Sequence, residues 1–175
     1  MTQTIIRPAT EADIPAITAI YQPAVLEGTA SFEIDPPDEA EMHRRYRAVM
    51  ETGFPYFVAE VDGGVRGYAY LGQYRPRPAY RYSVENSIYI DPSAHRMGLG
   101  RLLLARLIEI ATERGYRQMI AVIGDSGQAG SIGLHRALGF TFCGVIHSVG
   151  YKHGRWLDGV IMQRALGPGD TTPPA

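Results

Sequence analysis

Apolar and polar residues repeat along this chain with two different periods, which predict where its helices and strands lie. After Thr10 and Asp13, which have the spacing of a capping box, apolar residues recur at every third or fourth position as far as Gly28. This period predicts a first helix, preceded by a short strand in "TIIRPAT". A second and more polar helix is expected from Asp38 to about Met50, after the proline-containing loop "TASFEIDPPD".

The next segment has the period of strands. The stretch "YFVAEVDGGVRGYAYLG" predicts a hairpin, because its two strand-like runs are joined by glycines that can adopt the positive φ of a tight turn. The stretch "YSVENSIYI" also alternates, which predicts a further strand beside them. Its side chains divide between two faces, with Val84, Asn86, Ile88 and Ile90 on one and Glu85, Ser87 and Tyr89 on the other.

The second half returns to the helical period twice. A leucine-rich run after "DPSAHRMGLG" predicts a helix that stops at Gly115, and "QAGSIGLHRALG" predicts another, with the short buried strand "QMIAVIG" between them. Two last strands, "FTFCGVIHSVGYK" and "RWLDGVIMQRAL", turn at "HG". We therefore expect a single α/β domain over residues 1–166, built on a mixed sheet, and a disordered tail over residues 167–175.

Composition and charge narrow the class of protein. The 175 residues are 45% hydrophobic, but no apolar run approaches the roughly 18–20 residues of a membrane span, so no membrane contact is expected. The formal net charge of −1 offers no positive field for nucleic acid. The first residues lack the features of a secretion signal, which favours the cytoplasm. The one cysteine, Cys143, excludes an internal disulfide, and its side chain is expected to be buried.

The stretch "HRMGLGR" is the first candidate for chemistry. Gly98 and Gly100 stand where a helix begins, so free N–H groups and the helix dipole favour an anion such as phosphate there. Arg96 and Arg101 add positive charge, although a plain strand-to-helix turn would need the same glycines. A dinucleotide fingerprint fails because Leu103 occupies the position of its small third residue, and no Lys followed by Ser or Thr completes a Walker A loop.

"HRMGLG" resembles the coenzyme A pyrophosphate loop of the GNAT superfamily of N-acetyltransferases, Gln/Arg-x-x-Gly-x-Gly/Ala, with His95 in the position of Gln or Arg. Other stretches resemble the phosphinothricin and methionine sulfone acetyltransferase branch: "TASFE", "SVENSIYIDP", "AVIG", "LHRALGF" and "YKHGRWLDGVIMQ". The resemblance covers about residues 4–166. It implies an α/β (α+β) single-domain GNAT acyltransferase fold, with a mixed, mostly antiparallel sheet flanked by helices. It also implies acetyl-CoA as the acetyl donor, a small-molecule amine as the acceptor, and a homodimer.

The reaction implied is attack of an amine on the acetyl thioester, followed by loss of the coenzyme A thiolate. The resemblance implies that Glu85 is the general base. It also implies that His135, at a position where many members have Tyr, protonates the sulfur. Without the resemblance, Glu85 reads as a solvated strand carboxylate and His135 as a packing or capping residue.

The remaining site residues fall into two groups. Coenzyme contacts are implied for Ile88, Tyr89, Ile90, His95, Arg96, Met97, Gly98, Leu99, Gly100, Arg101 and Gln128. In "QYRPRPAYRY", Arg75 and Arg77 are expected to hold a carboxylate or phosphinate of the acceptor. The apolar part of the acceptor is expected to contact Phe32, Tyr80 and Tyr82.

Two other functions stay open at this point. One is acetylation of protein N-termini or lysines, and the other is acyl-CoA binding without catalysis. A metal centre is not expected, because the five histidines lack the ligand spacing of zinc sites.

Overall fold

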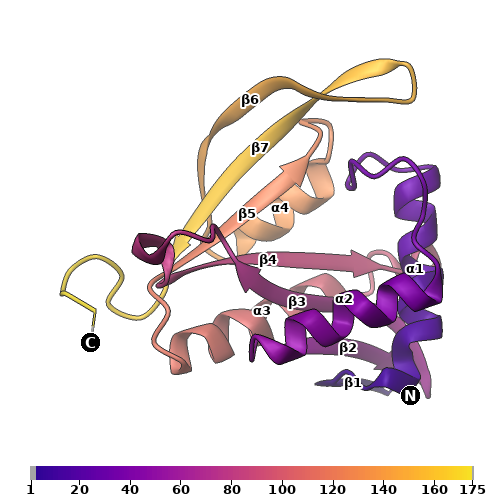
Figure 1. Cartoon of the computed structure of the whole chain (residues 1–175), viewed down its shortest axis with the longest axis horizontal. Coiled ribbons are helices and arrows are strands. Elements are labelled where there is room, and N and C mark those ends of the chain that lie inside the picture. Colours follow the sequence, from indigo (N-terminus) through magenta and orange to yellow (C-terminus); the bar gives the residue numbers. More distant parts are fainter. Residues whose placement is uncertain (1–2, 175) are drawn as a thin grey trace.

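The computed structural model describes residues 3–174 as a seven-stranded sheet with helices on both faces (Figure 1). The strands lie in the order β1-β2-β3-β4-β5-β7-β6. Their bounds are β1 (Thr4–Pro8), β2 (Tyr56–Val61), β3 (Gly64–Gln73), β4 (Ser83–Ile90), β5 (Gln118–Gly124), β6 (Thr141–Lys152) and β7 (Arg155–Ala165). Every neighbouring pair is antiparallel except β4 and β5. The predicted mixed, mostly antiparallel sheet is therefore confirmed.

The helices are α1 (Ile14–Leu26), α2 (Glu39–Glu51), α3 (Leu99–Glu113) and α4 (Ala129–Ala137), with short 3-10 turns at Glu11–Asp13, Pro78–Tyr80 and Pro92–Ala94. All four were predicted. Within residues 3–174, none of the helices combines the length and the apolar composition that crossing a bilayer requires.

Two hydrophobic clusters hold the helices on the sheet. The α3 side contains Leu99, Leu103 and Leu107, which are fully or almost fully buried and recur on one face of that helix. On the opposite side, α1 and α2 pack on a group of tyrosines that includes Tyr56 and Tyr68. The sheet is thus covered on both faces over β2–β4, which fixes the position of β4 between two layers.

Two predicted caps set where the first helices begin. The backbone N–H of Thr10 donates to the Asp13 carboxylate at 2.8 Å, so the capping box is confirmed. Asp38 accepts from the N–H of Glu41 at 2.8 Å and begins α2. Between the two helices, residues 27–38 form the loop that we call the α1–α2 loop.

One expectation differs from the structure, and another stays a prediction. The prediction that Cys143 is buried is wrong: it is exposed because β6 is an edge strand and its register shifts between Phe142 and Gly144. In the tail predicted to be disordered, residues 167–170 form a turn, and Arg117 donates to the carbonyls of Gly169 and Pro173, each at 2.9 Å. Residue 175 lies outside the described residues.

Candidate active site

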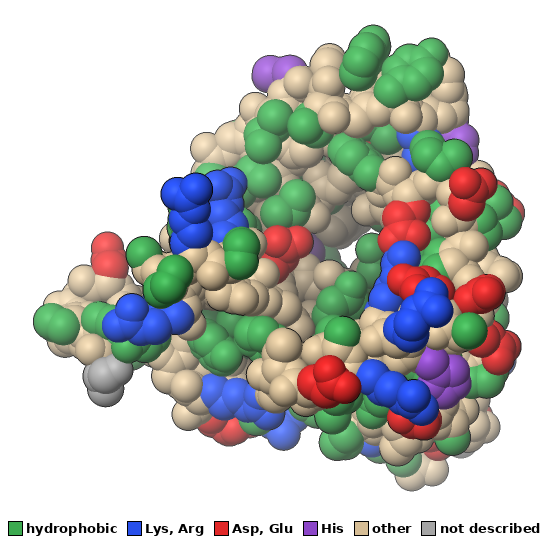
Figure 2. All heavy atoms as spheres, in the orientation of Figure 1, with side chains coloured by type: hydrophobic (Ala, Val, Ile, Leu, Met, Phe, Trp, Pro, Cys, Tyr) green, Lys and Arg blue, Asp and Glu red, His purple; other side chains and the backbone are tan. Residues whose placement is uncertain are grey.

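The site is centred on the place where β4 and β5 separate. The two strands pair only from Ser83–Gln118 to Glu85–Ile120, and beyond that point β5 follows β7 away from β4 (Figure 1). The edge of β4 from Asn86 to Ile90 consequently has no strand partner on the β5 side, although it stays paired with β3. Figure 2 shows that this face of the molecule is deeply hollowed at its centre, with acidic and basic side chains on the rim.

Glu85 lies at the last paired position of β4, on the same face as α1 and α2. It is half-buried, and burial raises the pKa of its carboxyl group above the ordinary value. Within residues 3–174, no side chain forms a hydrogen bond or ion pair with this carboxylate. A carboxylate that is partly desolvated and has no cationic partner is a better base than an exposed one.

His135 approaches β4 from the opposite face. It is buried in α4, and its Nε2 lies 2.9 Å from Nδ2 of Asn86, the residue after Glu85. Its Nδ1 lies 2.8 Å from the carbonyl oxygen of Ser131, which can only accept, so Nδ1 carries the proton and Nε2 accepts from Asn86. Burial lowers the pKa of the imidazole, outweighing the hydrogen bond to Ser131, and favours this neutral form.

The glycine loop has the geometry of an anion site. Gly98 is the N-cap of α3 with φ of +82°, a conformation that glycine adopts without strain, and nothing stands within 4 Å of the place where a side chain would begin. The N–H groups of the first turn of α3 have no carbonyl partner within the helix. A diphosphate fits this position because it needs such donors and close backbone approach. Leu99 points its side chain into the core, so only its backbone faces the site.

The other coenzyme candidates lie in the loop before α3, in the first turn of α3 and at the start of α4. Arg96, Met97 and Arg101 are exposed in the loop and the first turn of α3. His95, at the position of the usual Gln or Arg, places Nε2 3.2 Å from the carbonyl oxygen of Ile90. Gln128, the N-cap of α4, donates through Nε2 to the Thr29 hydroxyl of the α1–α2 loop at 3.0 Å.

Of the predicted acceptor residues, four come from the loop between β3 and β4. The Arg75 guanidinium lies over the rings of Tyr74 and Tyr80, at 5.2 and 5.7 Å from their centroids, which holds it by cation–π contacts. Arg77 is exposed, and Tyr82 is half-buried at the start of β4. Because Gly72, just before this loop, pairs with Glu85, the loop begins next to the candidate base.

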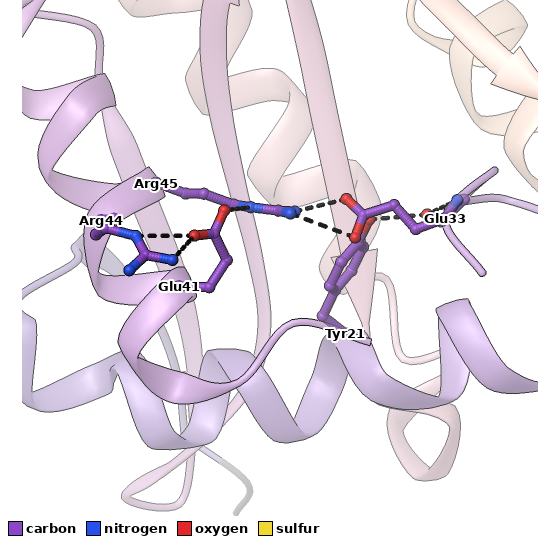
Figure 3. Close-up of polar contacts among 6 residues, drawn as sticks. Tyr21, Glu33, Glu41, Arg44 and Arg45 are labelled. Atoms are coloured by element: carbon purple, nitrogen blue, oxygen red, sulfur yellow. Dashed lines mark hydrogen bonds and ion pairs between the residues drawn. The ribbon is translucent and has the colours of Figure 1, made fainter. Parts of the chain in front are cut away.

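The fifth residue, Phe32, lies on the α1–α2 loop, which an ionic network ties down (Figure 3). Arg45 of α2 bridges Glu41 and Glu33, with its nitrogens 2.8 and 2.5 Å from their carboxylates. Glu33 also accepts from the hydroxyl of Tyr21 at 3.1 Å. Arg45, Glu33 and Tyr21 line a cavity of about 90 Å³ together with Tyr56, Tyr68 and Tyr70.

Sequence reasoning missed the residues that fasten this loop. Asp125 accepts from Thr29 at 2.9 Å and from Arg155 at 2.6 Å, and the buried Lys152 donates to the carbonyl of Ser31 at 2.8 Å. Lys152 and Arg155 lie in "YKHGRWLDGVIMQ" and Ser31 lies in "TASFE", but nothing in these stretches indicates that their side chains hold one loop. Buried lysines are rare in proteins, but the burial of Lys152 cannot be predicted from the sequence.

Comparisons with known proteins agree with this geometry. A family model described as an acetyltransferase (GNAT) domain matches residues 6–161. The chain is 53% identical to a phosphinothricin N-acetyltransferase of Alcaligenes faecalis, over 97% of this chain and 86% of that protein. It is 44% identical to an L-methionine sulfoximine/L-methionine sulfone acetyltransferase of Pseudomonas paraeruginosa, over 96% of this chain and 98% of that protein. A crystal structure of a GNAT superfamily phosphinothricin acetyltransferase from Sinorhizobium meliloti in complex with AcCoA superposes with a TM-score of 0.95 and 48% identity, covering 98% of this chain and 93% of the other.

Proposed function

The chain belongs to the GNAT family of acetyltransferases, and on this basis we propose that it moves the acetyl group of acetyl-CoA to the amino group of a small amino-acid analogue. The acceptors are of the phosphinothricin, methionine sulfoximine or methionine sulfone type, as the names of its relatives indicate. One observation carries the proposal: β4 and β5 separate directly after Glu85, and the end of the free β4 edge, at Ile90, contacts the first turn of the helix capped by Gly98. This arrangement provides a slot for the coenzyme arm and an anion site for its diphosphate at one end.

Acetyl transfer needs a neutral amine. We assign Glu85 as the group that takes a proton from the acceptor ammonium, directly or through a water molecule. The amine nitrogen then forms a bond to the acetyl carbon as the bond from that carbon to sulfur breaks, and the thiolate that leaves gains a proton. The raised pKa of Glu85 supports this assignment, because a base whose pKa is closer to that of the ammonium transfers the proton more readily.

His135 is the proposed donor of the proton to sulfur. In the structure its Nε2 accepts from Asn86, so it would first have to gain a proton there. The Asn86 side chain can accommodate that change by turning its amide, since its Oδ1 is buried and, among the described residues, has no partner. The neutral resting form and this spare acceptor support a proton that resides on Nε2 only during turnover.

For the acceptor, we propose that Arg75 and Arg77 bind its carboxylate or phosphinate. Guanidinium groups form paired hydrogen bonds with both anions. The contacts of Arg75 with Tyr74 and Tyr80 support this role because they hold the guanidinium in place before the acceptor arrives.

We also propose a homodimer that acts in the cytoplasm. Exposed apolar side chains on β5, β6 and β7 support the dimer; they are Val122, Phe142, Ile146, Val149 and Trp156. Light scattering on the purified protein tests the dimer.

Thiol release from acetyl-CoA tests the reaction. Phosphinothricin, methionine sulfone and methionine sulfoximine should each release coenzyme A, whereas a short peptide should not. Turnover with the peptide alone would favour acetylation of protein N-termini. Binding of acetyl-CoA without thiol release in any arm would favour a non-catalytic module.

A further inference from the structure

Phe32 lies in a slot that exists because two other positions have no side chain. A Cβ built on Gly150 of β6 would lie 2.6 Å from both Cδ2 and Cε2 of the Phe32 ring. A Cβ on Gly124, at the end of β5, would lie 2.9 Å from Cε1 of the same ring. Carbon atoms do not approach this closely, so any larger residue at either position would displace the ring.

The backbone on both sides of Phe32 is fixed, so that the ring cannot move away freely. The carbonyl of Ser31 accepts from the buried Lys152, and its hydroxyl lies 2.8 Å from the hydroxyl of Tyr21. Glu33 is held by Arg45. With both neighbours tied, a ring pushed from the glycine side turns about its own side-chain bonds instead of carrying its loop with it.

Phe32 is nonetheless 39% exposed, which is high for a ring with this much support. One side of it is covered by β5 and β6, and the α1–α2 loop to which it belongs lies beneath the tip of the β6–β7 hairpin, at the open end of the divide between β4 and β5 (Figure 1). Because the ring is exposed on its remaining side and its loop lies at this opening, the ring is available to an acceptor that enters there.

We propose that Gly150 is a specificity-determining position of the acceptor site. The absent side chain at 150 sets how far the Phe32 ring projects into the hollow, and the ring limits the length and bulk of the acceptor side chain. Gly124 acts in the same sense, but a Cβ there would also lie 2.6 Å from the carbonyl oxygen of Thr29, so its replacement would move backbone as well. This inference rests on the proposed acetylation of small amino acids.

Steady-state kinetics of Gly150→Ala test it. The added methyl group should raise KM for methionine sulfone by about tenfold, the scale on which one methylene alters binding in an apolar pocket, and leave KM for acetyl-CoA unchanged. Gly144→Ala is the matched control, because Gly144 lies on the same strand and has nothing within 4 Å of its Cβ position. It should alter neither constant.

A double variant separates this mechanism from general damage. In a Phe32→Leu background the smaller side chain leaves room for the methyl group, so Gly150→Ala should no longer raise KM for methionine sulfone. The double variant also allows KM to be measured if the single variant folds poorly.

The inference is overturned if Gly150→Ala and Gly144→Ala have the same KM for methionine sulfone. It is also overturned if Gly150→Ala raises this KM to the same extent when Phe32 has been replaced by leucine. An inactive wild-type enzyme would overturn the proposed function and this inference with it, whereas active wild-type enzyme with an indifferent Gly150→Ala variant would overturn the inference alone.

Discussion

Asn86 of β4 and His135 of α4 are joined by a hydrogen bond of 2.9 Å directly beyond the point where β4 and β5 stop pairing. The bond ties a helix to the free edge of β4 on the face opposite Glu85. It therefore connects the two sides of the reaction centre proposed above. The protonation state of the histidine is set at its other ring nitrogen, which faces a carbonyl oxygen and therefore carries the proton.

The first prediction concerns that protonation state. At pH 7.5 the imidazole of His135 should be neutral with its proton on Nδ1, because Nδ1 must donate to Ser131 and Nε2 must accept from Asn86. Nitrogen-15 chemical shifts of the histidine rings measure this directly, with His135→Gln identifying the signal. A proton found on Nε2 would contradict the hydrogen-bond assignment.

The second prediction is a pH-dependent stability. Burial lowers the pKa of His135 below the ordinary 6.5, so acid protonates the unfolded chain before the folded one. The stability from this residue is complete above about pH 6.5 and falls as the pH drops below it. Between pH 7.5 and 5.5, the melting temperature of the wild-type protein should therefore fall further than that of His135→Gln. If the melting temperatures of the two proteins fell equally with pH, the lowered pKa of His135 would be contradicted.

Glu85→Gln should separate activity from stability. We expect kcat to fall by about 10²- to 10⁴-fold, the usual contribution of a general base. The variant should also melt at a higher temperature at neutral pH, because the half-buried carboxylate is charged there and has no described partner, whereas the amide is neutral. The gain should vanish toward pH 4, where the raised pKa leaves the wild-type carboxyl group protonated. Unchanged turnover would remove Glu85 from the mechanism.

Gly98→Ala should weaken acetyl-CoA binding. Alanine at φ of +82° is strained by about 1–2 kcal/mol, so the loop will either stay strained or change shape. A higher KM for acetyl-CoA is expected, together with a melting temperature lowered by about 2–8 °C. Gly53→Ala is the matched control, since Gly53 also has positive φ and open space around it but lies at the end of α2. It should lower the melting temperature to a similar extent and leave KM for acetyl-CoA unchanged.

Arg75→Ala and Arg77→Ala should each raise KM for phosphinothricin while leaving KM for acetyl-CoA unchanged. A charge-assisted hydrogen bond contributes about 1.5–3 kcal/mol, which corresponds to a rise of roughly tenfold or more. Arg106→Ala serves as the control, because Arg106 also lies over an aromatic ring, Phe57, but on α3. An equal loss of affinity for both substrates would indicate a folding defect.

The sequence by itself determined the elements, their order and the glycine cap of α3. Each of these follows from interactions among residues close in the chain: the period of apolar positions, a capping side chain, a glycine that can take positive φ. Glu85 and Asn86 were placed on opposite faces of one strand for the same reason, since adjacent side chains of a strand always diverge.

Only the tertiary structure decided which of these local features meet. Three contacts depend on the order of strands in the sheet: the hydrogen bond between His135 and Asn86, the packing of Phe32 against Gly150, and the hydrogen bond of the buried Lys152 to Ser31. The exposure of Cys143 depends on β7, not β6, lying next to β5. A periodic pattern fixes the face on which a side chain lies, but the partner on that face is set by packing among segments far apart in the chain. That packing is cooperative and leaves no local signal in the letters.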